Sequence, residues 1–184
     1  MSEFTLLGIS GALRAGSTNT SFVKEAARLF DPAEFQLADL RLPLFDADLE
    51  ADGIPQSVQT LADQVSAADA VVISTPEYNK NLSGVLKNAL DWISRTPGSP
   101  WRGKPVAILS AAAGRAGGER AQYSLRHCMT PFRPRILQGP EVMLADTRNQ
   151  FDDNGHLTNE QTLKMLGLLM DGLRNEVRLV KGAN

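Results

Sequence analysis

The chain of 184 residues has 42% hydrophobic and 22% charged residues, which is typical of one soluble globular domain, here residues 1–184, with a core of its own. Its net charge of −2 gives no electrostatic basis for binding nucleic acid or an anionic membrane surface. One cysteine and two histidines exclude an intramolecular disulfide framework and make a metal site unexpected.

The first ten residues contain neither the basic region nor the apolar run of a signal peptide. Nowhere does the chain approach the roughly 20 apolar residues of a membrane span. We therefore expect a cytoplasmic protein without a membrane partner.

The amino-terminal part of the chain predicts two strands, each followed by a helix. Short apolar strands are expected at Phe4–Ile9 and Glu34–Ala38, and apolar residues at helical spacing indicate helices at Thr20–Phe30 and Ser57–Ala67. Prolines and a glycine between the second strand and the second helix indicate an excursion loop over residues 39–56.

The middle of the chain, residues 71–92, indicates the type of sheet and where a ligand would bind. Val71–Ile73 is a β-branched run without polar alternation, which is typical of a buried strand. It leads through a polar turn, Thr75–Asn79, into an amphipathic helix from about Ser83. A strand followed by a polar loop and a helix is half of a βαβ unit, and in open parallel sheets the loops at the carboxyl ends of the strands hold the ligand.

The carboxyl-terminal part continues the alternation. A strand at Pro105–Ser110 leads through a loop of small residues, 111–118, into a helix at Glu119–Met129. A fifth strand is expected within Pro134–Leu144, where two prolines favour an edge position or a bulge. The last helix is expected to begin at a capping box, Thr158–Gln161.

This alternation predicts an α/β domain in which helices cover both faces of a parallel sheet. Five strands with five helices match the doubly wound strand order 2-1-3-4-5, in which strands 1 and 3 are neighbours. The loops after strands 1, 3 and 4 would then converge on one crevice.

The first of these loops has the composition of an anion site. It offers the Ser17 and Thr18 hydroxyls, the Asn19 amide and the Arg14 guanidinium, and it opens a helix whose free N–H groups favour an anion. Its glycine spacing is close to that of a P-loop, but Ser17 occupies the lysine position, and no G-x-G-x-x-G fingerprint is present. A single phosphate therefore fits better than a diphosphate, and the alternative is a polar turn that binds nothing.

The other two loops suit a flat heterocycle. Pro76 would stiffen the third loop, its backbone groups would hydrogen-bond a ring, and Tyr78 would stack against that ring. The small side chains of residues 111–118 would let a ring lie close to the backbone. Each loop alone is compatible with an exposed turn, but together they predict a phosphate pocket beside a ring pocket.

These residues resemble the NAD(P)H-dependent FMN reductases of flavodoxin-like fold, a family that includes bacterial quinone and chromate reductases and some azoreductases. The resemblance rests on GALRAGSTN (11–19), TPEYN (75–79) and GVLKNALDW (84–92), and it runs nearly the full chain. Ala12 departs from the family, which usually has serine there, so one hydroxyl is missing from the phosphate site and FMN binding is expected to be weaker. The residues that the resemblance implies are Arg14, Ser17, Thr18 and Asn19 for the FMN phosphate and Pro76, Glu77, Tyr78, Asn79, Ala111 and Gly114 for the ring.

The resemblance also implies a reaction. NADPH or NADH would reduce FMN, which would then reduce a small-molecule acceptor such as a quinone, flavin, chromate or azo compound in a ping-pong course. The cofactor carries this chemistry, so no side chain is expected as a general acid or base. The helix N-terminus after Gly118 would offset negative charge on the reduced ring.

Two alternatives remain open. One is a flavodoxin-like FMN-binding electron carrier without nicotinamide-dependent activity, and the other is a flavin-free binding domain. A carrier usually presents a strongly acidic face, and the balance of 19 basic to 21 acidic residues weighs against it.

The resemblance further implies a homodimer or a homotetramer. Trp92, late in its helix, and the pair Arg120 and Tyr123, three residues apart, are residue types that are enriched in interfaces. The alternative is that Trp92 belongs to the core of the monomer and that the other two are solvated.

Overall fold

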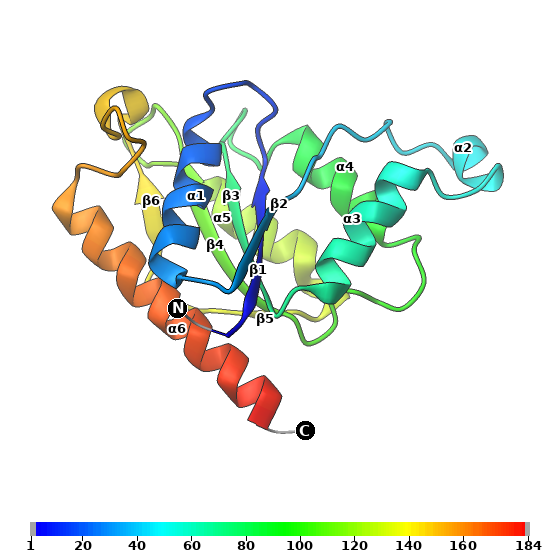
Figure 1. Cartoon of the computed structure of the whole chain (residues 1–184). Helices are drawn as coiled ribbons and strands as arrows, with labels where there is room; N and C mark the ends of the chain where they lie inside the picture. The colour runs from blue at the N-terminus through cyan, green and yellow to red at the C-terminus, as the bar shows by residue number, and fades with distance from the viewer. Residues whose placement is uncertain (1–2, 183–184) are drawn as a thin grey trace.

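The computed structural model describes residues 3–182 as a parallel β-sheet between two layers of helices (Figure 1). The strand order β2-β1-β3-β4-β5 confirms the predicted architecture, and a sixth strand also pairs with β4. All the strand pairings are parallel. The strands are β1 (Thr5–Ser10), β2 (Glu34–Leu37), β3 (Ala70–Thr75), β4 (Pro105–Ala111), β5 (Arg135–Ile136) and β6 (Val142–Leu144).

Helices α1 and α6 cover one face of the sheet, and α3, α4 and α5 cover the other (Figure 1). The short helix α2 lies apart from both layers, at the far right of Figure 1. The helices are α1 (Thr18–Phe30), α2 (Ala47–Ala51), α3 (Gln56–Ala67), α4 (Gly84–Ile93), α5 (Glu119–Met129) and α6 (Glu160–Gly182), with 3₁₀ turns at Thr130–Phe132 and Thr147–Asn149.

The central strands have no polar alternation because both of their faces are buried. Val72 on β3 lies opposite Ala107 on β4, and both pack under α1 and α6. The next pair along the two strands, Ile73 and Ile108, packs on the opposite face under α4 and α5. Each strand therefore supplies both cores, as the apolar run Val71–Ile73 predicted.

The excursion between β2 and α3 is more ordered than expected, because it contains α2 and is anchored to α4. The indole N–H of Trp92 donates to the Pro43 carbonyl at 2.8 Å, and the Phe45 ring packs edge-on against the indole with 5.0 Å between ring centroids. Trp92 is 0% exposed in the monomer. The prediction that it lies at an interface is wrong, and the alternative, a core residue, is correct.

Two element boundaries also differ from the prediction. The expected fifth strand is divided into β5 and β6, which pair with successive parts of the same edge of β4 around a cis Gly139–Pro140 bond. The last helix is capped by Asn159, whose Oδ1 accepts from the Thr162 N–H at 2.9 Å. Thr158 is not the cap, because its hydroxyl instead donates to the Gln150 carbonyl.

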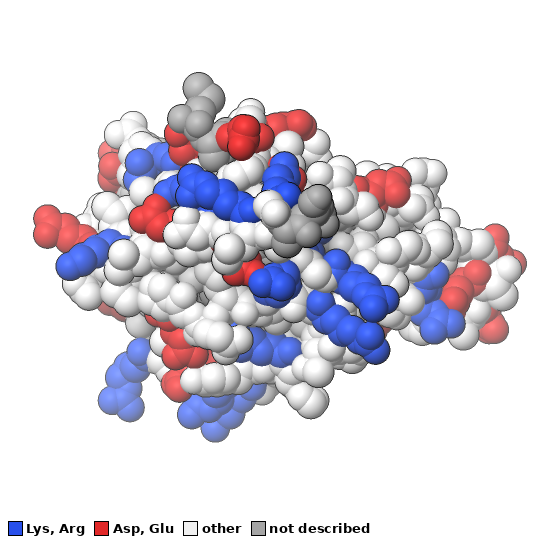
Figure 2. All heavy atoms as spheres, turned by 90° about the horizontal axis from the view of Figure 1, so that it is seen from below, with Lys and Arg blue, Asp and Glu red and all other residues white. Residues whose placement is uncertain are grey.

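The surface carries both signs of charge. Figure 2, seen from below, shows basic side chains in several small groups with acidic ones between them, and no acidic field dominates that face. Within residues 3–182, no helix combines the length and the hydropathy needed to cross a membrane. The same residues contain no cluster of three or more histidine, cysteine or acidic side chains that would hold a metal ion.

Candidate active site

The loops at the carboxyl ends of β1, β3 and β4 enclose a cavity of about 680 Å³ at the top of the sheet in Figure 1. The strand order brings them together, because β1 pairs with β3 and β3 pairs with β4. The cavity size lies within the usual range for ligand pockets, about 300–1,000 Å³. The lining residues are Ala12–Arg14, Ser17–Asn19, Pro76–Tyr78, Ala111–Gly118, Arg120 and Thr147.

The first loop ends in an open helix N-terminus. Ser17 is the N-cap residue of α1, but its hydroxyl caps no backbone N–H. Ser17 is 3% exposed, whereas Arg14 is exposed, and the Arg14 guanidinium has no partner among the described residues. A buried hydroxyl, uncapped N–H groups and an unpaired cation therefore line one end of the cavity.

Asn19 does not present its side chain to this end of the cavity. Its Nδ2 donates to the Ala111 carbonyl at 3.0 Å, and its Oδ1 accepts from the Ser74 hydroxyl at 2.7 Å and from the Ala111 N–H at 3.2 Å. Asn19 is 4% exposed. Both polar atoms of the amide therefore bond to the ends of β3 and β4, and the backbone N–H of Asn19 in the first turn of α1 has no intrahelical acceptor.

Glu77 in the third loop caps a helix on the opposite side of the cavity. Its carboxylate accepts from the Arg120 backbone N–H at 3.1 Å, in the first turn of α5, and lies 3.8 Å from the Arg120 guanidinium. The N-terminus of α5 was expected to offset negative charge on a ring. This carboxylate already partly neutralises that helix end.

The rest of the third loop is a tight turn. Tyr78 exchanges two backbone hydrogen bonds of 3.1 Å with Asn81, and the turn between them places Asn79 and Lys80 at positive φ. Tyr78 is 59% exposed and lines the cavity, whereas Asn79 does not line it. Pro76 is buried below the turn and lines the cavity floor.

The fourth loop is held at its base by a buried polar chain. The Ser110 hydroxyl donates to the Gly117 carbonyl at 2.7 Å and accepts from Gln122 Nε2 at 2.9 Å. Gly118 has φ +93°, and a Cβ there would lie 2.8 Å from the Ser110 Cβ, so only glycine fits. The segment between Ala111 and Gly117, which has small side chains except for Arg115, is thereby kept as a wall of the cavity.

The structure brings nine of the ten predicted site residues to one cavity, and Asn79 is the exception. The sequence did not indicate Thr147, which follows β6 and reaches the cavity from the edge of the sheet. It also did not indicate the roles of Ser74 and Gln122, whose partners lie 55 and 12 residues away along the chain.

Comparison with known proteins assigns the family. The model of the NADPH-dependent FMN reductase family matches residues 4–148. The chain is 42% identical over 182 residues to an NAD(P)H-dependent FMN reductase of Pseudomonas aeruginosa, with 98% of each chain covered. It is 38% identical over 173 residues to a quinone reductase of Escherichia coli, with 90% of this chain and 92% of the relative covered.

The chain belongs to the NADPH-dependent FMN reductase family. Its fold is similar to that of FerB, a flavoenzyme NAD(P)H:(acceptor) oxidoreductase from Paracoccus denitrificans, with a TM-score of 0.86 and 31% identity over 95% of this chain and 97% of the other. The predicted flavodoxin-like fold and the prediction of an FMN-dependent NAD(P)H oxidoreductase are confirmed, and the comparisons do not support the alternative of an electron carrier.

Proposed function

We propose that this FMN reductase uses the cavity at the carboxyl ends of β1, β3 and β4 to hold FMN and to reduce quinones or similar flat acceptors. The observation that carries the proposal is the open N-terminus of α1 beside Arg14, which is unpaired within residues 3–182, next to a wall of small residues. The relatives named as quinone reductases support a quinone as the acceptor class.

The donor set of the first loop fits a phosphate monoester. The first-turn N–H groups of α1 and the Ser17 and Thr18 hydroxyls provide uncharged donors, and Arg14 adds a full charge. No lysine is present in the loop to reach a second phosphate. Ala12, at the position where a hydroxyl was expected, leaves the helix terminus and Arg14 as the main source of affinity for the phosphate.

The third and fourth loops fit a flat ring. The segment from Ala112 to Ala116 has no side chain larger than alanine except Arg115, so a ring can lie against the backbone. Tyr78 at the rim offers an aromatic face on which a flat acceptor can stack. FMN, when bound, supplies hydride acceptance and onward electron transfer.

The protein groups therefore bind and orient, and we assign no general acid or base. Arg14 and Ser17 hold the phosphate, while Pro76 and the backbone around Ala111 set the plane of the ring. The carboxylate of Glu77 accepts a hydrogen bond from the Arg120 N–H, which holds it at the start of α5. Both substrates use the same open side of the cavity, which supports alternating rather than simultaneous binding.

A visible spectrum of the purified protein and anaerobic additions of NADPH and NADH test this function. We expect a flavin spectrum, release of FMN on denaturation, and bleaching by at least one of the two nicotinamides. With a quinone as acceptor, double-reciprocal plots of the initial rate against the nicotinamide concentration, recorded at several fixed quinone concentrations, should be parallel. Failure to bind FMN in a fluorescence titration contradicts the proposal, and intersecting lines contradict the shared binding region.

We also propose that the protein is a homodimer or a homotetramer. With Trp92 buried, the support comes from α5, where Arg120 and Tyr123 are both exposed on one face and Tyr123 is 52% exposed. Arginine and tyrosine are typical of interface centres. Light scattering at micromolar concentration measures the mass directly, and a fully active monomer contradicts this part of the proposal.

A further inference from the structure

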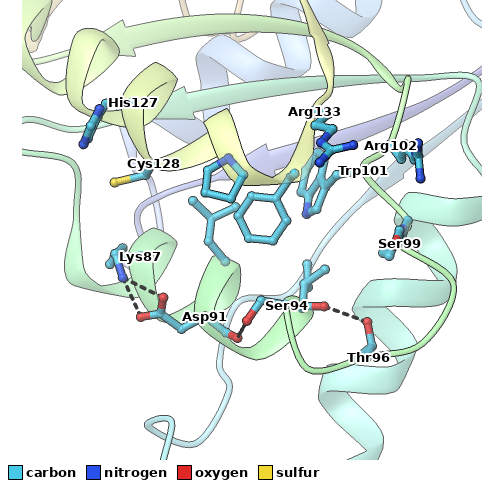
Figure 3. Close-up of a pocket in the computed structure, with 15 residues that line it drawn as sticks. Lys87, Asp91, Ser94, Thr96, Ser99, Trp101, Arg102, His127, Cys128 and Arg133 are labelled. Atoms are coloured by element: carbon cyan, nitrogen blue, oxygen red, sulfur yellow. Dashed lines mark hydrogen bonds and ion pairs between the residues drawn. The ribbon is translucent and has the colours of Figure 1, made fainter.

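A second cavity, of about 710 Å³, lies away from the crevice and shares no lining residue with it. It is enclosed by the end of α4, the connection 94–104, the last turn of α5 and the 3₁₀ turn Thr130–Phe132 (Figure 3). Because it lies at the far ends of α4 and α5 from the crevice, the proposed reaction assigns it no role.

One wall of this cavity holds a buried donor without an acceptor. Trp101 is 2% exposed, and its indole Nε1 has no hydrogen-bond partner within residues 3–182. The other tryptophan, Trp92, has its Nε1–H paired with the Pro43 carbonyl at 2.8 Å. Buried polar groups in native proteins are nearly always paired, so an acceptor from outside the chain would gain a hydrogen bond at this donor.

The Trp101 side of the cavity carries unpaired positive charge. Figure 3 shows Arg102 and Arg133 on the same side as Trp101, and a hydrogen bond of 3.0 Å from the Gly103 N–H to the Arg133 carbonyl ties the two segments together. Neither guanidinium has a partner among the residues that the structure describes.

The acidic group of the cavity does not offset this charge. Asp91 lies at the other end of the cavity in Figure 3, where it is paired with Lys87 at 2.6 Å. The Trp101 end is therefore rich in donors and poor in acceptors. An anionic oxygen is the chemistry that matches an indole N–H and two guanidinium groups on the same side of a cavity.

Five of the remaining lining residues are apolar, and inorganic phosphate or sulfate would leave them uncovered. The polar ones are Ser94, Thr96, Ser99 and His127. A ligand that fills the cavity needs an apolar body as well as an anionic head, because buried apolar surface provides most of the affinity in small-molecule pockets. The apolar lining residues are Leu90, Ile93, Pro100, Pro131 and Phe132.

We propose that this cavity binds a small organic anion, a carboxylate on a flat apolar body, whose oxygen accepts the Trp101 Nε1–H near Arg102 and Arg133. The site is separate from the crevice, so its occupant is neither FMN nor a substrate of the reductase reaction. The proposal does not depend on the acceptor that the enzyme reduces.

The two indole N–H signals of the FMN-loaded, ¹⁵N-labelled protein test the proposal by NMR, with benzoate as the probe. We expect benzoate to move the Trp101 signal downfield in a saturable way and to leave the Trp92 signal in place; Trp101→Phe assigns the pair. Benzamide has the same body without the charge, and inorganic phosphate has charge without the body, so both should shift the Trp101 signal far less. The absence of a saturable shift with benzoate overturns the proposal, as does an equal response to benzamide or phosphate.

Charge-removing variants test the head group. We expect Arg102→Gln and Arg133→Gln each to raise the dissociation constant for benzoate about tenfold, the loss of one charge-assisted hydrogen bond. Arg133 has φ +56°. Glutamine at this position keeps the Cβ and most of the aliphatic part of the arginine side chain. Arg178→Gln is the matched control, because Arg178 lies on α6 across the sheet and bonds to Asn175. Unchanged flavin spectra show that each variant is folded, and unchanged benzoate affinity in both pocket variants overturns the proposal.

Discussion

The side chain of Asn19 and the backbone of Ala111 form a reciprocal pair, in which Asn19 Nδ2 donates to the Ala111 carbonyl at 3.0 Å and the Ala111 N–H donates to Asn19 Oδ1 at 3.2 Å. The pair joins the first turn of α1 to the end of β4, and Ser74 adds a bond from β3. One buried amide is therefore the common anchor of the three loops that form the crevice. The relative position of the phosphate loop and the ring loops depends on it.

Asn19→Ala removes this anchor. The change leaves the Ser74 hydroxyl and the Ala111 N–H and carbonyl without partners in a buried place, so we expect the free energy of unfolding to fall by about 2–4 kcal/mol. Urea unfolding of the apoprotein measures it. Affinities for FMN and riboflavin should fall by similar factors, because the phosphate loop and the ring loops all move. A loss confined to FMN would instead mean that Asn19 contacts the phosphate directly.

Arg14→Ala tests the phosphate site without disturbing the fold, because the guanidinium is exposed and unpaired among the described residues. A charge-assisted hydrogen bond contributes roughly 1.5–3 kcal/mol, so FMN should bind about tenfold more weakly or worse. Riboflavin, which has no phosphate, should bind almost unchanged. Arg178→Ala, on α6 outside the crevice, is the control and should leave FMN affinity unchanged. Equal losses for FMN and riboflavin in Arg14→Ala contradict the assignment.

The two tryptophans form a matched pair for stability. Trp92→Phe and Trp101→Phe remove the same volume from buried sites, but only the first loses a hydrogen bond, the one from Trp92 Nε1 to the Pro43 carbonyl. That carbonyl keeps a second donor, Asn88 Nδ2 at 2.9 Å. Trp92→Phe should therefore cost about 0.5–1.5 kcal/mol more in the free energy of unfolding than Trp101→Phe, the net contribution of one hydrogen bond. Guanidinium unfolding of both variants under one buffer condition compares them. An equal cost would mean that packing alone decides, with no measurable share for the bond.

The acid stability of the protein should depend on Glu25, which is 2% exposed on α1. Burial raises the pKa of this carboxyl, but hydrogen bonds from Arg28 and His156 outweigh burial, and the pKa lies below the ordinary glutamate value. A lowered folded-state pKa means that the stabilisation is present above the ordinary value and is lost as the pH falls through the folded-state pKa.

Glu25→Gln should accordingly be less stable than the wild type at neutral pH, and the difference should shrink as the pH falls below about 4.3, the ordinary glutamate value. Denaturant unfolding across that range gives the difference at each pH. A difference that grows toward acid contradicts the assigned direction of the pKa.

The identity and order of the elements were readable from local pattern. The uninterrupted run at Val71–Ile73 identified a strand buried on both faces, and the alternation of strands and helices predicted the order that the sheet adopts. The split of the last strand was not readable, because pairing with either part of the β4 edge depends on backbone geometry around Pro140 rather than on side-chain periodicity.

The candidate site was predicted in its location but not in the role of every residue. Strand ends of a parallel sheet meet at one edge, so the loops at residues 11–19, 75–79 and 111–118 had to converge once the strand order was known. The presence of an asparagine at position 19, however, does not show whether its amide binds a phosphate or hydrogen-bonds to two strands. The choice depends on Ser74 and Ala111, which are distant along the chain.

The sequence by itself determined where most of the strands and helices lie, because periodicity and turn residues act over a few neighbouring positions. The strand order, and with it the edge of the sheet where the ligand loops meet, was an inference from the doubly wound pattern. Only the tertiary structure decided what each polar or aromatic side chain pairs with. It shows that Trp92 lies in the core and that the Glu77 carboxylate accepts a hydrogen bond from the first turn of α5. It also shows that Trp101 Nε1, beside a second cavity, has no acceptor within residues 3–182. The physical reason is that a hydrogen bond depends on a partner within about 3 Å, and chain segments far apart in sequence supply that partner.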